Sequence, residues 1–318
     1  MIEHEGMIVS DEVSDALFDG TGVVALETTL ISHGFPHPEG VQVALESEAA
    51  VRAHGAVPAT IGVIDGVVHV GLTADQIARF GERAAEVRKL GPRDLGVCVA
   101  QGATGATTVG ATITICRLAG ISVMGTGGIG GVHRGFPAPP DVSADLGALA
   151  RLEVVVVSAG VKSILDVPAT CELLETLGVP VLGWQTDTMP LFYTAAGGPP
   201  VTARVETAAD GAAIAQAHWH LEGGGLLVTR PPDTSIDVEP LIADALAEAA
   251  ARGVSGKDVT PFVLGYLHEH SDGRTLAVNR ELIVANAGLA GELAMALAPE
   301  DDDMHEFLFR ESDDDDLA

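Results

Sequence analysis

The stretch that decides the fold is residues 153–166, EVVVVSAGVKSILD. It opens with four consecutive valines, which favour a buried β-strand and are too few to cross a membrane. A Ser-Ala-Gly turn ends the run, and Lys162 follows it. Asp166 then gives the N-cap signal of a helix that ends at Gly178, and residues 179–184 form a second apolar strand. This strand–loop–helix–strand unit predicts an α/β fold with a lysine at the carboxyl end of a buried strand, where open sheets bind ligands.

Lys162 has two interpretations. The chain has only three lysines among its 17 basic residues, at positions 89, 162 and 257, so arginine supplies most surface cations. An ammonium held against an apolar strand loses hydration, its pKa falls, and the neutral amine becomes a nucleophile toward a carbonyl. The alternative is a lysine that extends from the strand end to water, which is the commoner fate of this side chain. Position alone leaves both open.

Composition favours the same fold class. The chain has 318 residues, of which 47% are hydrophobic but only 4% aromatic. Small apolar residues suit a mostly parallel sheet covered by helices better than they suit a β-sandwich. We expect residues 1–299 to form one α/β domain. From residue 300 the sequence changes to EDDDMHEFLFRESDDDDLA, which predicts a disordered acidic tail at 300–318 because it buries little apolar surface.

Charge and targeting signals narrow the classes of partner. A net charge of −28 argues against nucleic acid and anionic membranes as partners, because both would repel the chain. The N-terminal MIEHEGMIVSDEV lacks the basic start and apolar core of a signal peptide, and no apolar run reaches membrane length. Three widely spaced cysteines among apolar residues indicate reduced core thiols. We therefore expect a cytoplasmic protein.

Hydrophobic patterning and turn residues place the other elements. Strands are predicted at 22–26, 60–64, 67–70, 121–124, 154–157, 179–184 and 226–229, with 60–70 forming a hairpin. Helices are predicted at 39–52, at 105–119, 166–178, 208–220, 238–252, 259–270 and 275–297, and from a cap at Thr73 up to Lys89. Residues 185–201 are predicted to be a loop.

The glycine-rich loop at 125–131, GTGGIGG, contains the spacing GxGxxG. A dinucleotide site needs a helix to start within that pattern, but VHRGFPAPPD follows, with three prolines in four residues. Two interpretations remain, a flexible turn and a cradle of backbone amides for a phosphate, with charge added by His133 and Arg134. Thr126 within the loop and His133 after it are candidate substrate contacts.

Carboxylates at two places suggest a metal site and a general acid. Asp141 and Asp145 are four residues apart in DVSAD, and hard oxygen ligands of this kind suit Mg²⁺ or Mn²⁺. The alternative is a capping pattern at a helix start, which spacing alone favours. Glu27 ends an apolar strand, where partial burial would raise its pKa and make it a general acid. An exposed acid at the strand end is the alternative for Glu27.

Taken together, several stretches resemble the pseudouridine-5′-phosphate glycosidase family. They are VALETTLISHGFPHPEG, GAVPATIGVIDG, GATTVGATI, TGGIGGVHRG, DVSADL, AGVKSILD, GVPVLGWQTD and VTPFVLGYL. These strings occur in order over roughly residues 20–297, so the resemblance is far more specific than any single motif. It implies the reversible reaction of pseudouridine 5′-phosphate and water to ribose 5-phosphate and uracil. It also implies a three-layer α/β/α sandwich, one Mn²⁺ per subunit and a homotrimer.

The resemblance also implies roles for individual residues. Lys162 in AGVKSILD matches the family's covalent nucleophile, and Glu27 in ALETT matches its proton donor. Asp141 matches the metal ligand. The further matches are to substrate contacts, at Lys89, Val109, Ser143, Ala144 and Asp145. The family typically shows adjacent asparagines near the C-terminus where this chain has Ala285-Asn286, which leaves Asn279 and Asn286 as candidates for that role.

The chemistry of a C-glycoside supports a lysine nucleophile. Glycosidases usually protonate an exocyclic glycosidic oxygen, and a sugar joined to its base through carbon has none. An amine that attacks C1′ as the ring opens can expel the protonated base carbon and leave an imine. Two rival functions are a Schiff-base aldolase and a non-catalytic sensor of a sugar phosphate. The aldolase would normally be a (β/α)₈ barrel, whose regular alternation this chain breaks at the 60–70 hairpin and in its helix-rich end.

Overall fold

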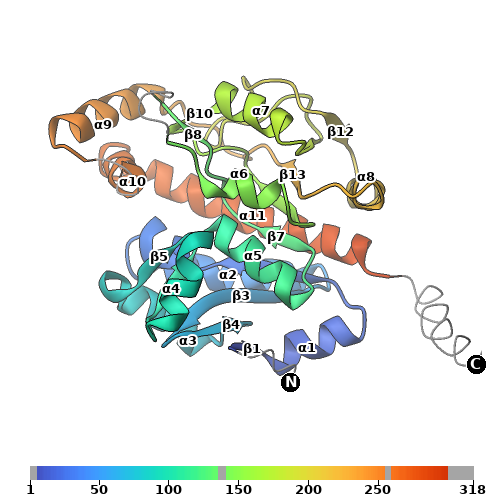
Figure 1. Ribbon diagram of the computed structural model, residues 1–318. Helices are drawn as coiled ribbons and strands as arrows, with labels where there is room; N and C mark the ends of the chain where they lie inside the picture. The colour runs from blue at the N-terminus through green and yellow to red at the C-terminus, as the bar shows by residue number, and fades with distance from the viewer. Residues whose placement is uncertain (1–5, 135–140, 255–258, 300–318) are drawn as a thin grey trace, which may run out of the picture.

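The computed structural model describes residues 6–134, 141–254 and 259–299, so the predicted tail at 300–318 lies outside the described residues (Figure 1). Within this part of the chain, eleven strands form one mixed sheet whose main path has the order β1-β4-β3-β2-β7-β9-β13-β11-β12. Off this path, β6 pairs with β3, and β5 pairs with β6. The strands are β1 Met7–Val9, β2 Val23–Glu27, β3 Val57–Ile64, β4 Val67–Val70, β5 Arg88–Leu90, β6 Gly105–Thr107, β7 Val123–Gly125, β9 Val155–Ser158, β11 Val181–Trp184, β12 Ala203–Val205 and β13 Leu226–Thr229. A separate antiparallel pair is formed by β8 Val132–His133 and β10 Leu165–Asp166.

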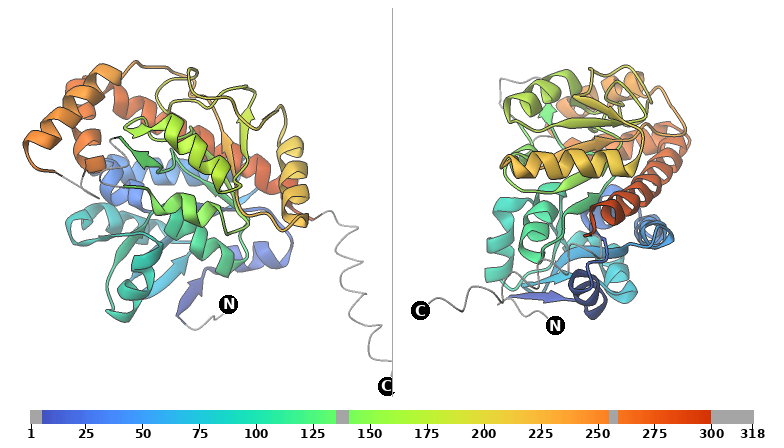
Figure 2. Two further views of the ribbon diagram at one scale, coloured as in Figure 1. Left: turned by 45° about the horizontal axis from the view of Figure 1, so that its top comes forward. Right: turned by 90° about the vertical axis from the view of Figure 1, so that its right-hand side faces the viewer.

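Helices cover both faces of the sheet. They are α1 Asp11–Phe18, α2 Glu39–Ala53, α3 Ala74–Glu82, α4 Leu95–Ala100, α5 Val109–Ala119, α6 Ala144–Leu149, α7 Val167–Thr176, α8 Ala208–His220, α9 Glu239–Ala251, α10 Val259–His270 and α11 Arg274–Leu297. Side chains of α2, α8 and α11 form a core on one face, and those of α1, α5, α6 and α7 pack on the other. The right-hand view of Figure 2 shows orange-red α11 on one side of the sheet and teal α5 on the other. The predicted three-layer α/β/α sandwich is confirmed.

The four valines of the deciding stretch explain this layering. Val154 and Val156 belong to the core on the α5 face, whereas Val155 and Val157 belong to the core on the α11 face. All four are buried, because β9 lies between β7 and β13 in the middle of the sheet. Successive strand residues point to opposite faces, so a strand covered on both sides needs an unbroken apolar run.

Two predicted helices were too long. Thr73 forms the predicted capping box with Gln76, but α3 ends at Glu82, and Lys89 lies on strand β5. Residues 105–107, predicted as the start of a helix, form β6, which pairs with β3 and β5. Each of these strands is three residues long, which is too short for a periodic pattern, so only pairing with a neighbour reveals them. The same reason explains why β1, which pairs with β4, was not predicted.

The order in which strands are added to the sheet reverses between β2 and β7. From β2 the chain proceeds to β3 on one side, and β7 later pairs with the other side of β2 in parallel. Such a switch point leaves a crevice at the carboxyl ends of the two strands, where open α/β sheets bind ligands. The sheet has free edges at β1 and β12, so it is not the closed barrel expected of the rival aldolase. In the described part of the chain, no helix combines the length and apolar character needed to cross a membrane.

Candidate active site

Glu27 and Thr126 flank the crevice at the switch point. Glu27 is the last residue of β2, and Thr126 follows the last residue of β7. Both are buried, and the Thr126 hydroxyl donates a hydrogen bond of 2.5 Å to Glu27 Oε1. Burial raises the pKa of Glu27 above its ordinary value, although the nearby Lys162 ammonium and the hydrogen bond from Thr126 lower it. Glu27 can therefore hold a proton at a pH where an exposed glutamate has lost it.

Lys162 is half-buried in the loop after β9, and backbone hydrogen bonds fix that loop to the glycine loop. Lys162 N–H donates to Ile129 O at 3.1 Å, and Ile129 N–H donates to Gly160 O at 3.0 Å. Gly160 has a φ of +87°, and a Cβ there would lie 2.4 Å from Pro190 O, so only glycine fits this turn. The turn directs the chain from the strand end toward Glu27, whose pKa is affected by the Lys162 charge.

Two lobes of a cavity meet at Glu27 and Lys162. Glu27, Thr29, Lys89 and Lys162 line both lobes and form their common wall. The apolar lobe has a volume of about 650 Å³, open solvent included, and its lining includes Leu30, Phe35, Ile164, Phe192, Leu264 and Ile283. The polar lobe has a volume of about 1350 Å³, and its lining includes Arg93, Thr108, His133, Asp141, Ser143 and Asp145. The predicted catalytic pair thus lies between an apolar and a polar compartment.

Asp145 organises the polar lobe through both of its oxygens. Gly110 N–H, in the first turn of α5, donates to Oδ1 at 2.8 Å, and Gly130 N–H donates to Oδ2 at 2.9 Å. Ser143 caps α6 by accepting from Asp145 N–H at 3.2 Å, so the capping interpretation of DVSAD is confirmed. Ala144 also lines the lobe. Val109, at the N-terminus of α5, is buried beside the lobe instead of lining it.

The polar lobe offers little to hold a metal ion directly. Asp141 precedes α6, so it does not share a helix face with Asp145, and both Asp145 oxygens accept backbone hydrogen bonds. Among the described residues, no group of three or more His, Cys, Asp and Glu side chains could hold a metal ion. Asp141 is partly exposed, and its Oδ2 lies 3.8 Å from His133 Nδ1. A hard cation bound by Asp141 would therefore keep water or substrate oxygens as its other ligands, as Mg²⁺ and Mn²⁺ commonly do.

Comparison with known proteins finds relatives over most of this chain. The family model for indigoidine synthase A like proteins matches residues 12–296. The pseudouridine-5′-phosphate glycosidase of Herpetosiphon aurantiacus is 50% identical over 298 residues, which cover 92% of this chain and 98% of that protein. That of a Nocardioides species is 46% identical over 301 residues, with 93% and 98% covered.

The chain belongs to the pseudouridine-5′-phosphate glycosidase family.

Solved structures agree with this family membership. A prealnumycin C-glycosynthase, AlnA, crystallised with ribulose 5-phosphate, has a TM-score of 0.85 and 40% identity, covering 93% of this chain and 98% of its own. An indigoidine synthase A-like protein from Thermotoga maritima has a TM-score of 0.84 and 35% identity, covering 94% and 99%. The predicted family and the prediction of an enzyme are confirmed.

The two asparagines near the C-terminus have different positions in this member of the family. Asn286 is completely buried, and its amide donates to Thr126 O at 2.9 Å and Gly127 O at 3.4 Å, so it holds the glycine loop. Asn279 lines the apolar lobe, and its Oδ1 is buried with no hydrogen-bond partner among the described residues. Asn286 Oδ1 is likewise buried without a partner among the described residues, but of the two asparagines only Asn279 lines the lobe.

The glycine loop packs inside the protein. The N–H groups of Thr126, Ile129 and Gly130 donate to Val157 O, Gly160 O and Asp145 Oδ2. A Cβ on Gly130 would lie 2.3 Å from the Ser143 hydroxyl, so close packing explains this glycine.

The expectation that Arg134 adds positive charge to a phosphate cradle was wrong. Its guanidinium forms a two-pronged ion pair with Glu239. A carboxylate therefore already pairs with the Arg134 charge. Neighbouring His133 lines the polar lobe, and its contact with a substrate stays a prediction.

Sequence reasoning missed part of the apolar lobe. Phe192 and Tyr193 come from the predicted loop at 185–201, and His33 and Phe35 come from the segment after Glu27. Tyr193 is fully buried, its hydroxyl has no partner among the described residues, and burial raises its pKa, so it stays neutral. A Phe-Tyr pair in a loop of a chain with few aromatic residues is the signal that could have revealed them.

Proposed function

We propose that this protein cleaves, reversibly, the C–C bond of pseudouridine 5′-phosphate to give uracil and ribose 5-phosphate, through a ring-opened ribosyl group linked to Lys162. The observation that carries the proposal is that Lys162 and Glu27 share the wall between an apolar and a polar lobe. A base and a sugar phosphate would then meet at an amine and a proton donor. The names of the relatives support this reaction.

The polar lobe suits the ribose phosphate. Lys89 lies on its wall, and Thr108, the N-cap residue of α5, also lines it. Backbone N–H groups at a helix N-terminus and a lysine ammonium both favour a bound phosphate. The Ser143 hydroxyl can donate a hydrogen bond to a sugar hydroxyl or accept one from it. The ribulose 5-phosphate bound to the AlnA neighbour supports a pentose phosphate as ligand.

The apolar lobe suits uracil. The rings of Phe35 and Phe192 provide flat apolar surface for the faces of a pyrimidine ring, and Ile283 adds an aliphatic contact. A buried polar atom without a partner is costly, so the Asn279 Oδ1 and the Tyr193 hydroxyl favour a ligand that carries both N–H and C=O groups. Uracil has two of each.

The proposed chemistry begins at Lys162. Its neutral amine attacks C1′, the C1′–O4′ bond breaks, and O4′ takes a proton as the ring opens. Protonation of C5 of uracil then allows the C1′–C5 bond to break, and the nitrogen lone pair forms the imine as the base leaves with the bonding electrons. Water adds to the imine and releases ribose 5-phosphate and the free amine. Glu27, whose raised pKa keeps a proton available, is the proposed donor.

Mn²⁺ is proposed as the cofactor, with Asp141 as its protein ligand. The partly exposed Asp141 carboxylate fits a cation that keeps most of its water. Such an ion supplies a positive charge that orients water and substrate oxygens. The homotrimer and the cytoplasmic location stay predictions.

One assay tests the reaction directly. Purified protein is incubated with pseudouridine 5′-phosphate and Mn²⁺, and free uracil is measured, with a chelated sample for comparison. Borohydride reduction in the presence of ribose 5-phosphate should add one reduced pentose phosphate to Lys162, which a non-catalytic sensor would not form. An adduct without uracil release would favour an aldolase over the glycosidase.

Replacing Lys89 with alanine should weaken binding of the phosphate. A hydrogen bond to a charged group contributes about 1.5–3 kcal/mol, so we expect KM for pseudouridine 5′-phosphate to rise roughly 10- to 100-fold. Steady-state kinetics check this, and unphosphorylated pseudouridine serves as the control because it lacks the group that Lys89 would bind. An unchanged KM would contradict the phosphate role.

Replacing Asn279 with alanine should weaken binding of the base and leave binding of the sugar phosphate unchanged. In the synthetic direction we expect KM for uracil to rise roughly tenfold, because a buried hydrogen bond is lost. KM for ribose 5-phosphate, measured in the same assay, should stay unchanged. Equal changes in both constants would show that Asn279 supports the site instead of contacting the base.

A further inference from the structure

Arg134 joins the loop of Lys162 to helix α9, which is distant in sequence. It directly follows β8 and is about one-third exposed. Its Nη2 donates to Ser163 O at 2.9 Å, and its Nε donates to Leu165 O at 3.4 Å. The same guanidinium pairs with both oxygens of Glu239, 105 residues away in sequence. Arg134 therefore holds two carbonyls that lie one and three residues after Lys162.

Those carbonyls belong to the turn that fixes the Lys162 backbone. Leu165 N–H donates to Lys162 O at 2.9 Å, and Lys162 N–H donates to Ile129 O on the other side. The β8–β10 pairing of His133 with Leu165 adds support from the strand that carries Arg134. Without the guanidinium, the Ser163 and Leu165 carbonyls would lose these donors, and the turn would have fewer restraints.

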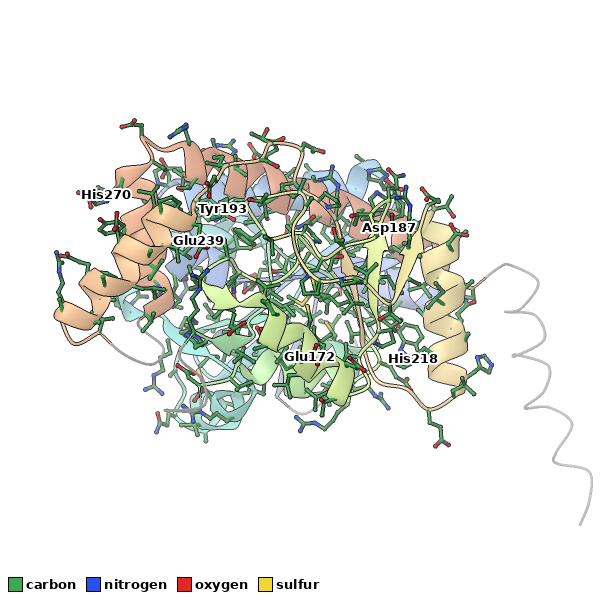
Figure 3. All side chains as sticks on the ribbon, turned by 90° about the horizontal axis from the view of Figure 1, so that it is seen from above. Glu172, Asp187, Tyr193, His218, Glu239 and His270 are labelled. Atoms are coloured by element: carbon green, nitrogen blue, oxygen red, sulfur yellow. The ribbon has the colours of Figure 1, made fainter. Side chains whose placement is uncertain are left out.

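Glu239 fixes the orientation of the guanidinium. It is the first residue of α9, where a carboxylate is also favoured by the helix dipole. A planar guanidinium bound on two oxygens has a defined plane, which a lysine ammonium cannot provide. Figure 3 shows Glu239 on the same side of the molecule as Tyr193 of the apolar lobe.

We propose that Arg134 is a positioning residue for Lys162. It holds the Ser163–Leu165 turn so that the amine reaches C1′, and Glu239 holds Arg134 in the required plane. The inference rests on the proposed function, because it assumes that Lys162 attacks the sugar. A misplacement of about 1 Å can cost roughly 100-fold in rate, so loss of the guanidinium should slow the attack much more than it weakens ground-state binding.

The test measures how fast Lys162 is modified. Wild type and Arg134→Ala are mixed with a series of ribose 5-phosphate concentrations, quenched with borohydride, and the reduced adduct on Lys162 is measured by mass spectrometry. We expect the maximal trapping rate of Arg134→Ala to fall roughly 100-fold, with little change in the half-saturating concentration. Millimolar guanidinium ion should restore part of the rate, because it can replace the missing donors.

Controls separate failure of the proposed function from failure of the inference on Arg134. Arg204→Ala removes another arginine with two carboxylate partners, Asp187 and Glu206, and Figure 3 shows Asp187 on the opposite side of the molecule from Glu239. It should trap at the wild-type rate. If wild type forms no adduct, the proposed function fails.

The inference on Arg134 is overturned by two results. One is that wild type forms the adduct and Arg134→Ala forms it equally fast. The other is that the Arg134→Ala variant changes only the half-saturating concentration. If Arg134→Ala does not fold, Arg134→Lys decides, with slower trapping expected and a wild-type rate overturning the inference.

Discussion

Lys162→Ala abolishes turnover of pseudouridine 5′-phosphate and leaves the fold intact. The variant lacks the only group proposed to form a covalent bond to the sugar, so we expect turnover to fall by about four orders of magnitude or more. The fold should survive because backbone atoms, not the Lys162 side chain, make the hydrogen bonds to Ile129 and Leu165. Uracil release and the circular dichroism spectrum measure the two effects.

Lys162→Arg is the matched control for this loss. Arginine keeps a positive charge beside Glu27 but stays protonated, so it cannot act as a nucleophile. We expect it to be as inactive as the alanine variant and to form no adduct with ribose 5-phosphate. Substantial activity in Lys162→Arg alone would show that the reaction requires a positive charge at this place and not an attacking amine. Substantial activity in Lys162→Ala would show that it requires neither.

Glu27→Gln should lower turnover by roughly 100- to 10,000-fold, which is the usual contribution of a positioned general acid. Glutamine keeps the size of the side chain and can still accept the hydrogen bond from Thr126, but it has no proton to give. The substitution therefore separates proton donation from packing. Steady-state kinetics with pseudouridine 5′-phosphate measure the loss, and a variant with near-normal turnover would exclude Glu27 as the donor.

The same substitution should stabilise the protein at high pH. Burial raises the pKa of Glu27 in the folded state above its unfolded value of about 4.3, so folding favours the protonated form. Stability is then greatest below the unfolded pKa and is lost as the pH rises through the folded pKa. Glutamine carries no charge at any pH, so Glu27→Gln should unfold at a higher temperature than wild type at pH 8. The difference should shrink toward pH 4.

Thermal unfolding across this pH range checks the prediction. Lys162 and Lys89 lower the pKa of Glu27, so the charged form is partly compensated in the wild type. The loss of hydration outweighs that attraction, so the charged form still lowers the stability of the folded state. A Gln variant that is less stable than wild type at pH 8, or a difference that does not change with pH, would contradict it.

The sequence by itself determined the central strand of the sheet and the place of Glu27 and Lys162 at its edge. Four valines at 154–157 specify a strand buried on both faces, because successive side chains point to opposite sides and all four are apolar. Glu27 ends one apolar strand and Lys162 closely follows another, so their place at the carboxyl edge of the sheet could be predicted from local pattern alone. These features depend on neighbours within a few residues.

Only the tertiary structure decided how the rest of the site is assembled. The sequence left Asp145 open as a metal ligand, as part of a helix cap or as a substrate contact. In the fold its two oxygens accept hydrogen bonds from the amides of Gly110 and Gly130, which are 35 and 15 residues away. Asn279 and Asn286 are equivalent candidates in sequence, but one lines the apolar lobe and the other holds Thr126 O. These roles depend on which partners a polar side chain meets across the fold, and hydrogen bonds between distant segments leave no periodic trace in the sequence.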